Sequence, residues 1–119
     1  MAKITAQEQH RLAMNIVGKY LEKNGYEFIA INSELGTNPQ FVCYKDKQLS
    51  FVLVKNVLYP EDPNRYDPIW IESMKLHAIT KKAELYYAGV GLANAEDMEA
   101  ELSTDSNYYV KFDGLIRVH

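Results

Sequence analysis

The chain has only one cysteine, Cys43, among its 119 residues. A single thiol excludes a disulfide scaffold, a cysteine-rich zinc site and a four-cysteine iron–sulfur cluster held within this chain. Cys43 lies in an apolar, β-rich segment, which predicts a buried and unreactive thiol. The three histidines (His10, His77 and His119) are scattered, and no two have metal-ligand spacing on one helix. We therefore expect no metal and no cofactor.

Long apolar runs and a basic excess are also missing. No run approaches the roughly 20 residues of a membrane-spanning helix, and the first eight residues lack the apolar segment of a signal peptide. This predicts a cytoplasmic protein without a membrane partner. The net charge is −3. Residues 1–60 contain 7 basic and 5 acidic residues, and residues 61–119 contain 6 basic and 11 acidic residues. Because non-specific nucleic-acid binders usually carry a basic excess, charge does not favour nucleic acid as a partner.

The length predicts one domain, residues 1–119, that can bury a core without disulfides or metal. Thr5 and Glu8 have the spacing of a capping box, and apolar residues recur after them at helical spacing. We expect a first helix from about 6 to 24, ended by Gly25 in a left-handed conformation. His10 and Met14 should lie near the margin of its apolar face.

Three β-rich segments follow, and the short connection between the second and third predicts a hairpin: 26–32, 40–44 and 49–55. The third is apolar on both faces up to Lys55, which predicts a central strand covered on both sides. After a proline-rich loop, Asp67 should cap a second helix that starts at Pro68 and ends near 84. Its expected buried stripe is Leu76, Ile79 and Ala83.

Residues 85–93 could continue that helix or form a strand. Gly89 and Gly91 favour the strand, because each glycine destabilises a helix interior by roughly 1 kcal/mol relative to alanine. A small-residue face would then let a helix pack closely. We expect a short acidic helix at 95–102, a turn at 104–107, and a closing strand over 108–118 that bends at Asp113-Gly114. The order α-β-β-β-α-β-α-β predicts a mixed sheet flanked by helices, in the α/β (α+β) class.

Four segments together resemble parts of one known family. They are residues 20–26 with Ile29 and Asn32, the strand 49–55, the helix in which Lys75, Ile79, Ala83, Tyr86 and Tyr87 occupy matching positions, and Val110-Lys111-Phe112-Asp113. That family is the YraN-like predicted nucleases of the restriction-endonuclease-like superfamily. The similarity spans about residues 14 to 116 and implies a single-domain restriction-endonuclease-like fold.

The resemblance also implies where metal ligands should be. The superfamily holds Mg²⁺ with an acidic residue on one strand and a glutamate two residues before a lysine on the next, since Mg²⁺ prefers oxygen ligands. In this chain the glutamate position is Leu53, and the aspartate position falls at Gln40 or Phe41. The helix-one glutamate position is Met14. We therefore expect that the nuclease site has been lost.

What is left is a vestigial pocket, expected to contain Lys55, Leu53, Phe41, Met14, Lys75 and Glu72. Lys55 could bind an anion, or it could be a strand-end lysine that reaches water along its apolar stem. Glu72 should face the apolar side of the second helix. There it could pair with Lys55 or act as a carboxylate favoured by the helix dipole.

The loop before the second helix supplies a candidate partner surface of Tyr59, Arg65, Tyr66 and Trp70. Tyr, Trp and Arg are enriched at interface hot spots, and aromatic residues beside Arg could instead stack single-stranded bases. A third alternative is that these side chains fold back as a lid on the core.

The leading hypothesis is a non-catalytic domain that acts by binding a protein partner or a second copy as a homodimer. One alternative is a metal-dependent nuclease with relocated carboxylates, using Asp46, Glu34 or Glu72. The other is a nucleic-acid-binding module without cleavage.

Overall fold

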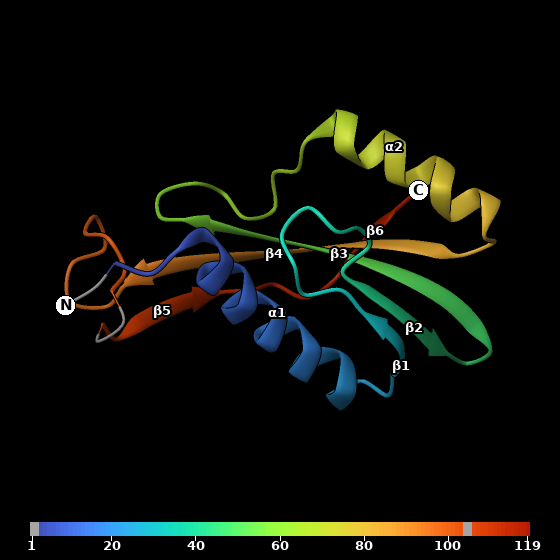
Figure 1. The fold of residues 1–119 in the computed structure, drawn as a ribbon, viewed down its shortest axis with the longest axis horizontal. Coiled ribbons are helices and arrows are strands. Elements are labelled where there is room, and N and C mark those ends of the chain that lie inside the picture. The colour runs from blue at the N-terminus through green and yellow to red at the C-terminus, as the bar shows by residue number, and fades with distance from the viewer. Residues whose placement is uncertain (1–2, 104–105) are drawn as a thin grey trace.

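The computed structural model describes residues 3–103 and 106–119, shown as a ribbon in Figure 1. Within these residues the chain forms two helices and one six-stranded mixed sheet, in the α+β class as predicted. The elements are α1 (Ala6–Lys23), β1 (Glu27–Ile31), β2 (Phe41–Lys45), β3 (Gln48–Leu58), α2 (Pro68–Thr80), β4 (Glu84–Asn94), β5 (Tyr108–Lys111) and β6 (Ile116–Val118).

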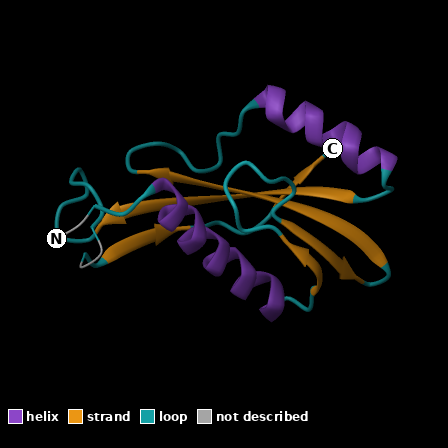
Figure 2. Cartoon of the chain, viewed as in Figure 1, coloured by secondary structure: helices purple, strands orange, loops and turns teal. Residues whose placement is uncertain are grey.

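The strands lie in the order β1-β2-β3-β4-β5. β6 pairs with the beginning of β4, at Leu85 to Tyr87, whereas β5 pairs with its end, at Gly91 to Asn94. The strands are orange in Figure 2. β1, β2 and β3 pair antiparallel, and the predicted β2–β3 hairpin is confirmed. β3 and β4 pair in parallel, with α2 as the crossover between them. β5 and β6 then pair antiparallel with β4. The longest strands, β3 and β4, therefore form the middle of the sheet.

β3 is covered on both faces, as its apolar sequence predicts. Val52 and Val54 join the cluster under α1, whereas Phe51 and Leu53 join the cluster under α2. All four side chains are buried. Full burial of side chains of this size stabilises a fold by about 1.5–3 kcal/mol each. The two clusters hold α1 and α2 on opposite faces of one sheet.

The beginning and end of α1 agree with the prediction. The Thr5 hydroxyl accepts a hydrogen bond from the Glu8 N–H at 3.1 Å, and the Glu8 carboxylate accepts one from the Thr5 N–H at 3.0 Å. Gly25, just past the helix, has a φ of +84°. His10 and Met14 are fully buried and do not lie at the margin of the apolar face.

α2 begins as predicted, with Asp67 as its cap and Pro68 in its first turn, but it ends at Thr80. Lys82 takes a positive φ there, and the Ala83 N–H donates back to the Ala78 carbonyl. Neither described helix is long and apolar enough to cross a membrane.

The predicted buried stripe of α2 is wrong. Leu76 and Ile79 are 68% and 70% exposed, and Ala83 packs against the core from beyond the helix end. The buried residues are Ile71, Met74 and Ala78. The helix carries apolar residues on both sides, so its spacing alone does not select the face that meets the sheet.

Residues 85–93 form part of a strand, β4, which settles that ambiguity. The segment that packs on its glycines is the proline-rich loop and not a helix. A Cβ at Gly89 would lie 1.9 Å from the Pro63 carbonyl oxygen. The Tyr87 hydroxyl donates to the same carbonyl at 2.7 Å, and Pro63 is buried. Gly89 is needed because the loop backbone crosses directly over it.

The acidic helix expected at 95–102 does not form. The Asn94 carboxamide oxygen accepts from the Glu96 N–H at 2.9 Å, and the chain continues in turns. A helix this short needs a buried apolar face, and Leu102 is the one buried residue of the segment. The bend at Asp113-Gly114 is confirmed, because it separates β5 from β6. The turn predicted at 104–107 includes residues 104–105, which lie outside the described residues.

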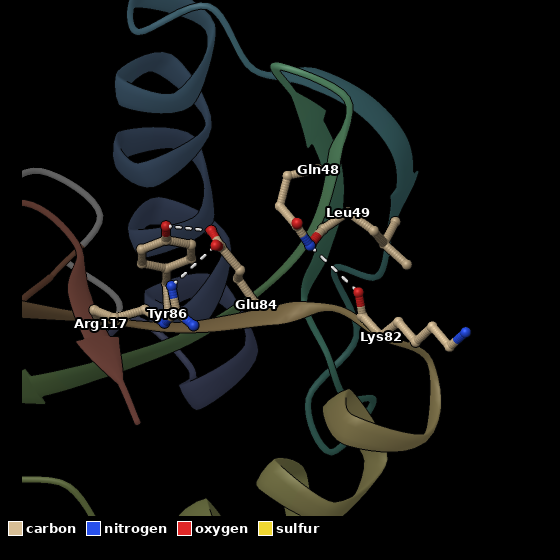
Figure 3. A network of polar contacts seen from close by, with 6 residues as sticks. All are labelled: Gln48, Leu49, Lys82, Glu84, Tyr86 and Arg117. Atoms are coloured by element: carbon tan, nitrogen blue, oxygen red, sulfur yellow. Dashed lines mark hydrogen bonds and ion pairs between the residues drawn. The ribbon is translucent and has the colours of Figure 1, made fainter.

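A polar network joins β6 to β4 (Figure 3). The Glu84 carboxylate pairs with the Arg117 guanidinium at 3.1 Å and accepts from the Tyr86 hydroxyl at 2.8 Å. The Arg117 guanidinium also lies 5.6 Å from the Tyr86 ring centroid. Beside it, the Gln48 amide donates to the Lys82 carbonyl at 3.3 Å, which ties the start of β3 to the chain entering β4.

We predict that Gly89→Ala destabilises the fold by about 2 kcal/mol or more, because the added Cβ must displace a buried backbone segment. Gly91→Ala is the matched control, since its Cβ would meet the nearest atom, of the Pro63 side chain, at 3.3 Å. Urea unfolding of both variants measures the difference. Equal losses in the two variants would contradict this account of the loop.

Candidate functional site

A cleft forms where β3 continues past the end of β2. Pairing between β2 and β3 stops at Phe41 and Val52, whereas β3 stays paired with β4 as far as Leu58. The side of β3 that β2 leaves open borders a cleft of about 350 Å³. That volume lies at the lower end of the range for small-molecule sites. The lining includes His10, Asn38, Gln40, Lys55, Asp67 and Trp70.

The two β3 positions of the sequence motif differ sharply in environment. Leu53 and Lys55 are two residues apart, so their side chains leave the same face of the sheet. Leu53 is fully buried in the cluster under α2, whereas Lys55 is partly exposed and borders the cleft. Of the two candidates for the aspartate position, Gln40 borders the cleft and Phe41 packs in the cluster under α1.

Gln40 fastens the loop before β2 to the open side of β3. Its amide oxygen accepts from the Val54 N–H at 2.7 Å, which replaces the missing strand partner. Its amide nitrogen donates to the Asn38 side-chain oxygen at 2.6 Å and to the Thr37 carbonyl at 3.0 Å. Gln40 is buried, and a carboxylate could not make the two donated bonds. This side chain therefore acts as a structural clamp.

His10 contributes a buried imidazole to the cleft wall from α1. It is 3% exposed, and its Nε2 has no hydrogen-bond partner among the described residues. Burial disfavours the charged form and lowers the pKa of His10. A folded-state imidazole of this kind stays neutral under conditions that protonate an ordinary histidine.

Two further polar residues at the cleft were not part of the predicted pocket. The Asp67 carboxylate accepts from the Ile69 N–H at 2.9 Å, as a helix cap does. The Asn56 amide donates to the Gln9 side chain at 3.2 Å and so ties β3 to α1. Helix capping was the one signal for Asp67 in the sequence, and it does not indicate that the cap borders a cleft.

The other members of the predicted pocket lie elsewhere. Met14 and Phe41 border a second hollow, between α1 and β1. Glu72 does not face the apolar side: its side chain is 70% exposed and pairs with the Lys75 ammonium at 3.3 Å. The structure therefore brings neither Glu72 nor Lys75 to the cleft lining beside Lys55.

The carboxylates considered for a relocated metal site are also spread out. Asp46 lies in the turn of the β2–β3 hairpin, and Glu34 is exposed on the loop between β1 and β2. In residues 3–103 and 106–119, no three His, Cys, Asp or Glu side chains are grouped closely enough to hold a metal ion. Asp67 is the carboxylate that borders the cleft.

The four residues of the candidate partner surface (Tyr59, Arg65, Tyr66 and Trp70) fall into two pairs with different environments. The Tyr66 ring lies 5.0 Å from the Tyr87 ring and the Trp70 ring lies 6.3 Å from it, both edge to face. These two residues match the lid alternative. Tyr59 is 45% exposed and borders a separate hollow beside β4 and β5, and Arg65 is exposed. Two of the four residues therefore pack on the core, and the other two are exposed.

We predict that Gln40→Glu destabilises the fold by about 2 kcal/mol or more, because it removes two donated hydrogen bonds and buries a charge. Gln48→Glu is the matched control. It also loses bonds from a side-chain amide, but at a partly exposed position. Thermal and urea unfolding compare the two. A loss at Gln40 no larger than at Gln48 would show that the clamp is unimportant.

We also predict that the burial of His10 lowers the stability of the fold at acid pH. The unfolded chain takes up a proton near the ordinary pKa of 6.5, while the buried imidazole resists it. The unfolded state then binds more protons, so stability falls as the pH drops from 7 to 5. Urea unfolding at both pH values should show a smaller fall in His10→Gln than in the wild type. His119→Gln, at an exposed position outside α2, should retain the wild-type fall. An unchanged fall in His10→Gln would refute the assignment.

Comparison with known proteins gives one family and no function. The model of a domain of unknown function, DUF8840, matches residues 7–118. No curated protein and no solved structure matches the chain. The family match runs from α1 to β6 and so includes every element that forms the cleft. The protein therefore belongs to the DUF8840 family.

Proposed function

We propose that this protein is a non-catalytic domain of restriction-endonuclease-like fold that acts by binding, and that its partner is a second copy of the same chain. The interface is the outward face of α2. The observation that carries the proposal is a row of exposed aliphatic side chains on that face.

Loss of catalysis is supported by the side chains at the motif positions. The resemblance requires an acidic residue on one strand and a glutamate two residues before Lys55 on the next. The first position falls at Gln40, which donates two hydrogen bonds, or at Phe41, which packs in the cluster under α1. The second is Leu53, which is fully buried among apolar residues. These side chains contribute to packing and stability in the places where oxygen ligands for a metal are expected.

The outward face of α2 supports association. Ile69, Leu76 and Ile79 are 82%, 68% and 70% exposed, while the opposite side of the same helix is buried on the sheet. Residues seven and three apart lie close together on a helix, so these three side chains form one apolar stripe. A helix that is apolar on both sides is typically buried on both sides. An added partner would remove this stripe from water.

The charges along α2 support a second copy as that partner. Asp67 caps the start of α2 and Glu72 lies in its first half, and the lysines follow in the second half and just beyond it: Lys75, Lys81 and Lys82. Two copies packed antiparallel across a two-fold axis place each acidic half against a basic half. A two-fold contact uses the same patch on both subunits, and this patch is complementary to itself.

We predict that Leu76→Glu converts a dimer into a monomer. It places a charge in the middle of the apolar stripe, yet it should change the unfolding stability of the isolated monomer by no more than about 0.5 kcal/mol, because the position is exposed in a single copy. The added stability that comes from association is lost with the contact. Sedimentation velocity over a range of concentrations gives the mass. The wild type should approach twice the mass of one chain, and Leu76→Glu should stay at the mass of one.

The control is Met98→Glu, which charges an exposed apolar side chain in the turn after β4. It should retain the wild-type mass. A wild-type protein that stays monomeric at high concentration would refute self-association, as would equal dissociation in Leu76→Glu and Met98→Glu.

A further inference from the structure

We propose that the cleft beside Lys55 binds a small organic acid, whose carboxylate or phosphate group takes the Lys55 ammonium as its counter-ion. This inference goes beyond self-association through α2, and neither depends on the other. It rests on a lysine ammonium and a buried imidazole that have no partner among the described residues, and on a cleft of matching size.

Lys55 supplies the charge. It is partly buried at the open side of β3, and none of the ion pairs among the described residues involves it. Asp67, the acidic residue that borders the same cleft, is engaged by the first turn of α2 through the Ile69 N–H. A helix N-terminus favours a carboxylate at that place. No ion pair joins Lys55 to Asp67 among the described residues, so the Lys55 ammonium can take an anion from outside the protein as its counter-ion.

His10 supplies the second observation. Its Nε2 is buried and has no partner among the described residues, although buried polar groups in proteins are nearly always hydrogen-bonded. A neutral imidazole can donate or accept one bond at that nitrogen. His10 borders the cleft, and its Nε2 is a polar atom of that wall which the described residues leave without a partner.

The walls favour a small molecule over a nucleic acid. Trp70 is partly buried, and its edge-to-face contact with Tyr87 fixes the indole as an apolar wall. The cleft holds about 350 Å³, which suits a compact ligand. Nucleic-acid interfaces are larger, about 600 Å² or more of protein surface, and strongly basic. This chain has a net charge of −3.

The test is an NMR titration of isotope-labelled protein with four probes: benzoate, benzyl alcohol, inorganic phosphate and a short single-stranded oligonucleotide. Benzoate and phosphate separate the two sources of the oxyanion, and benzyl alcohol is the uncharged analogue of benzoate. We expect one or both acids to cause saturable shifts of the His10 ring, the Trp70 indole and the Lys55 amide. Benzyl alcohol should bind more weakly than benzoate.

Lys55→Met keeps the apolar stem and removes the charge, and it should weaken acid binding about tenfold or more, as expected for one charge-assisted hydrogen bond. Lys19→Met, on the exposed side of α1, should bind as the wild type does. Lys55→Arg should retain binding, which separates lost charge from a damaged fold. Three results would each overturn the proposal: no saturable shift with either acid, equal binding by Lys55→Met, or binding of the oligonucleotide alone.

Discussion

The parallel pairing of β3 with β4 is the contact on which the rest of the structure depends. It runs from Ser50 and Glu84 to Leu58 and Leu92, well beyond the end of β2. The sheet built on this pair of strands has two apolar faces. α1 buries one cluster on the first face, and α2 buries another on the second. β3 continues past the end of β2, and this extension leaves open the side of β3 that borders the cleft. The parallel direction requires a crossover, and that crossover is α2, the helix with the exposed stripe.

Much of this fold could be predicted from local patterns. The capping box at Thr5 and Glu8, the hairpin and the doubly covered β3 each have a signal within a few residues of sequence. The strand at β4 could be favoured because glycines are poor in a helix. The reason for Gly89 could not be predicted, since it lies in a long-range contact with Pro63 that no local pattern records.

The site was less predictable than the fold. Lys55 and Leu53 could be placed from the strand pattern, but His10 and Asp67 come to the cleft from distant parts of the chain. The face of α2 was predicted wrongly because apolar residues occur on both of its sides. The sheet selects Ile71, Met74 and Ala78, and it leaves Leu76 and Ile79 outside. The exposed apolar residues of α2 are the basis of the self-association that we propose.

Self-association through α2 can be tested most directly by a cross-link at Ser73, which lies on the exposed side of α2 between Ile69 and Leu76. Native Cys43 will not compete, because it is buried and burial raises its pKa to about 11. Under mild oxidation, Ser73→Cys should form a covalent dimer rapidly at micromolar concentration. Asn15→Cys, at an exposed position on α1, should remain monomeric. Equal and slow cross-linking of the two variants would contradict an interface between copies at α2.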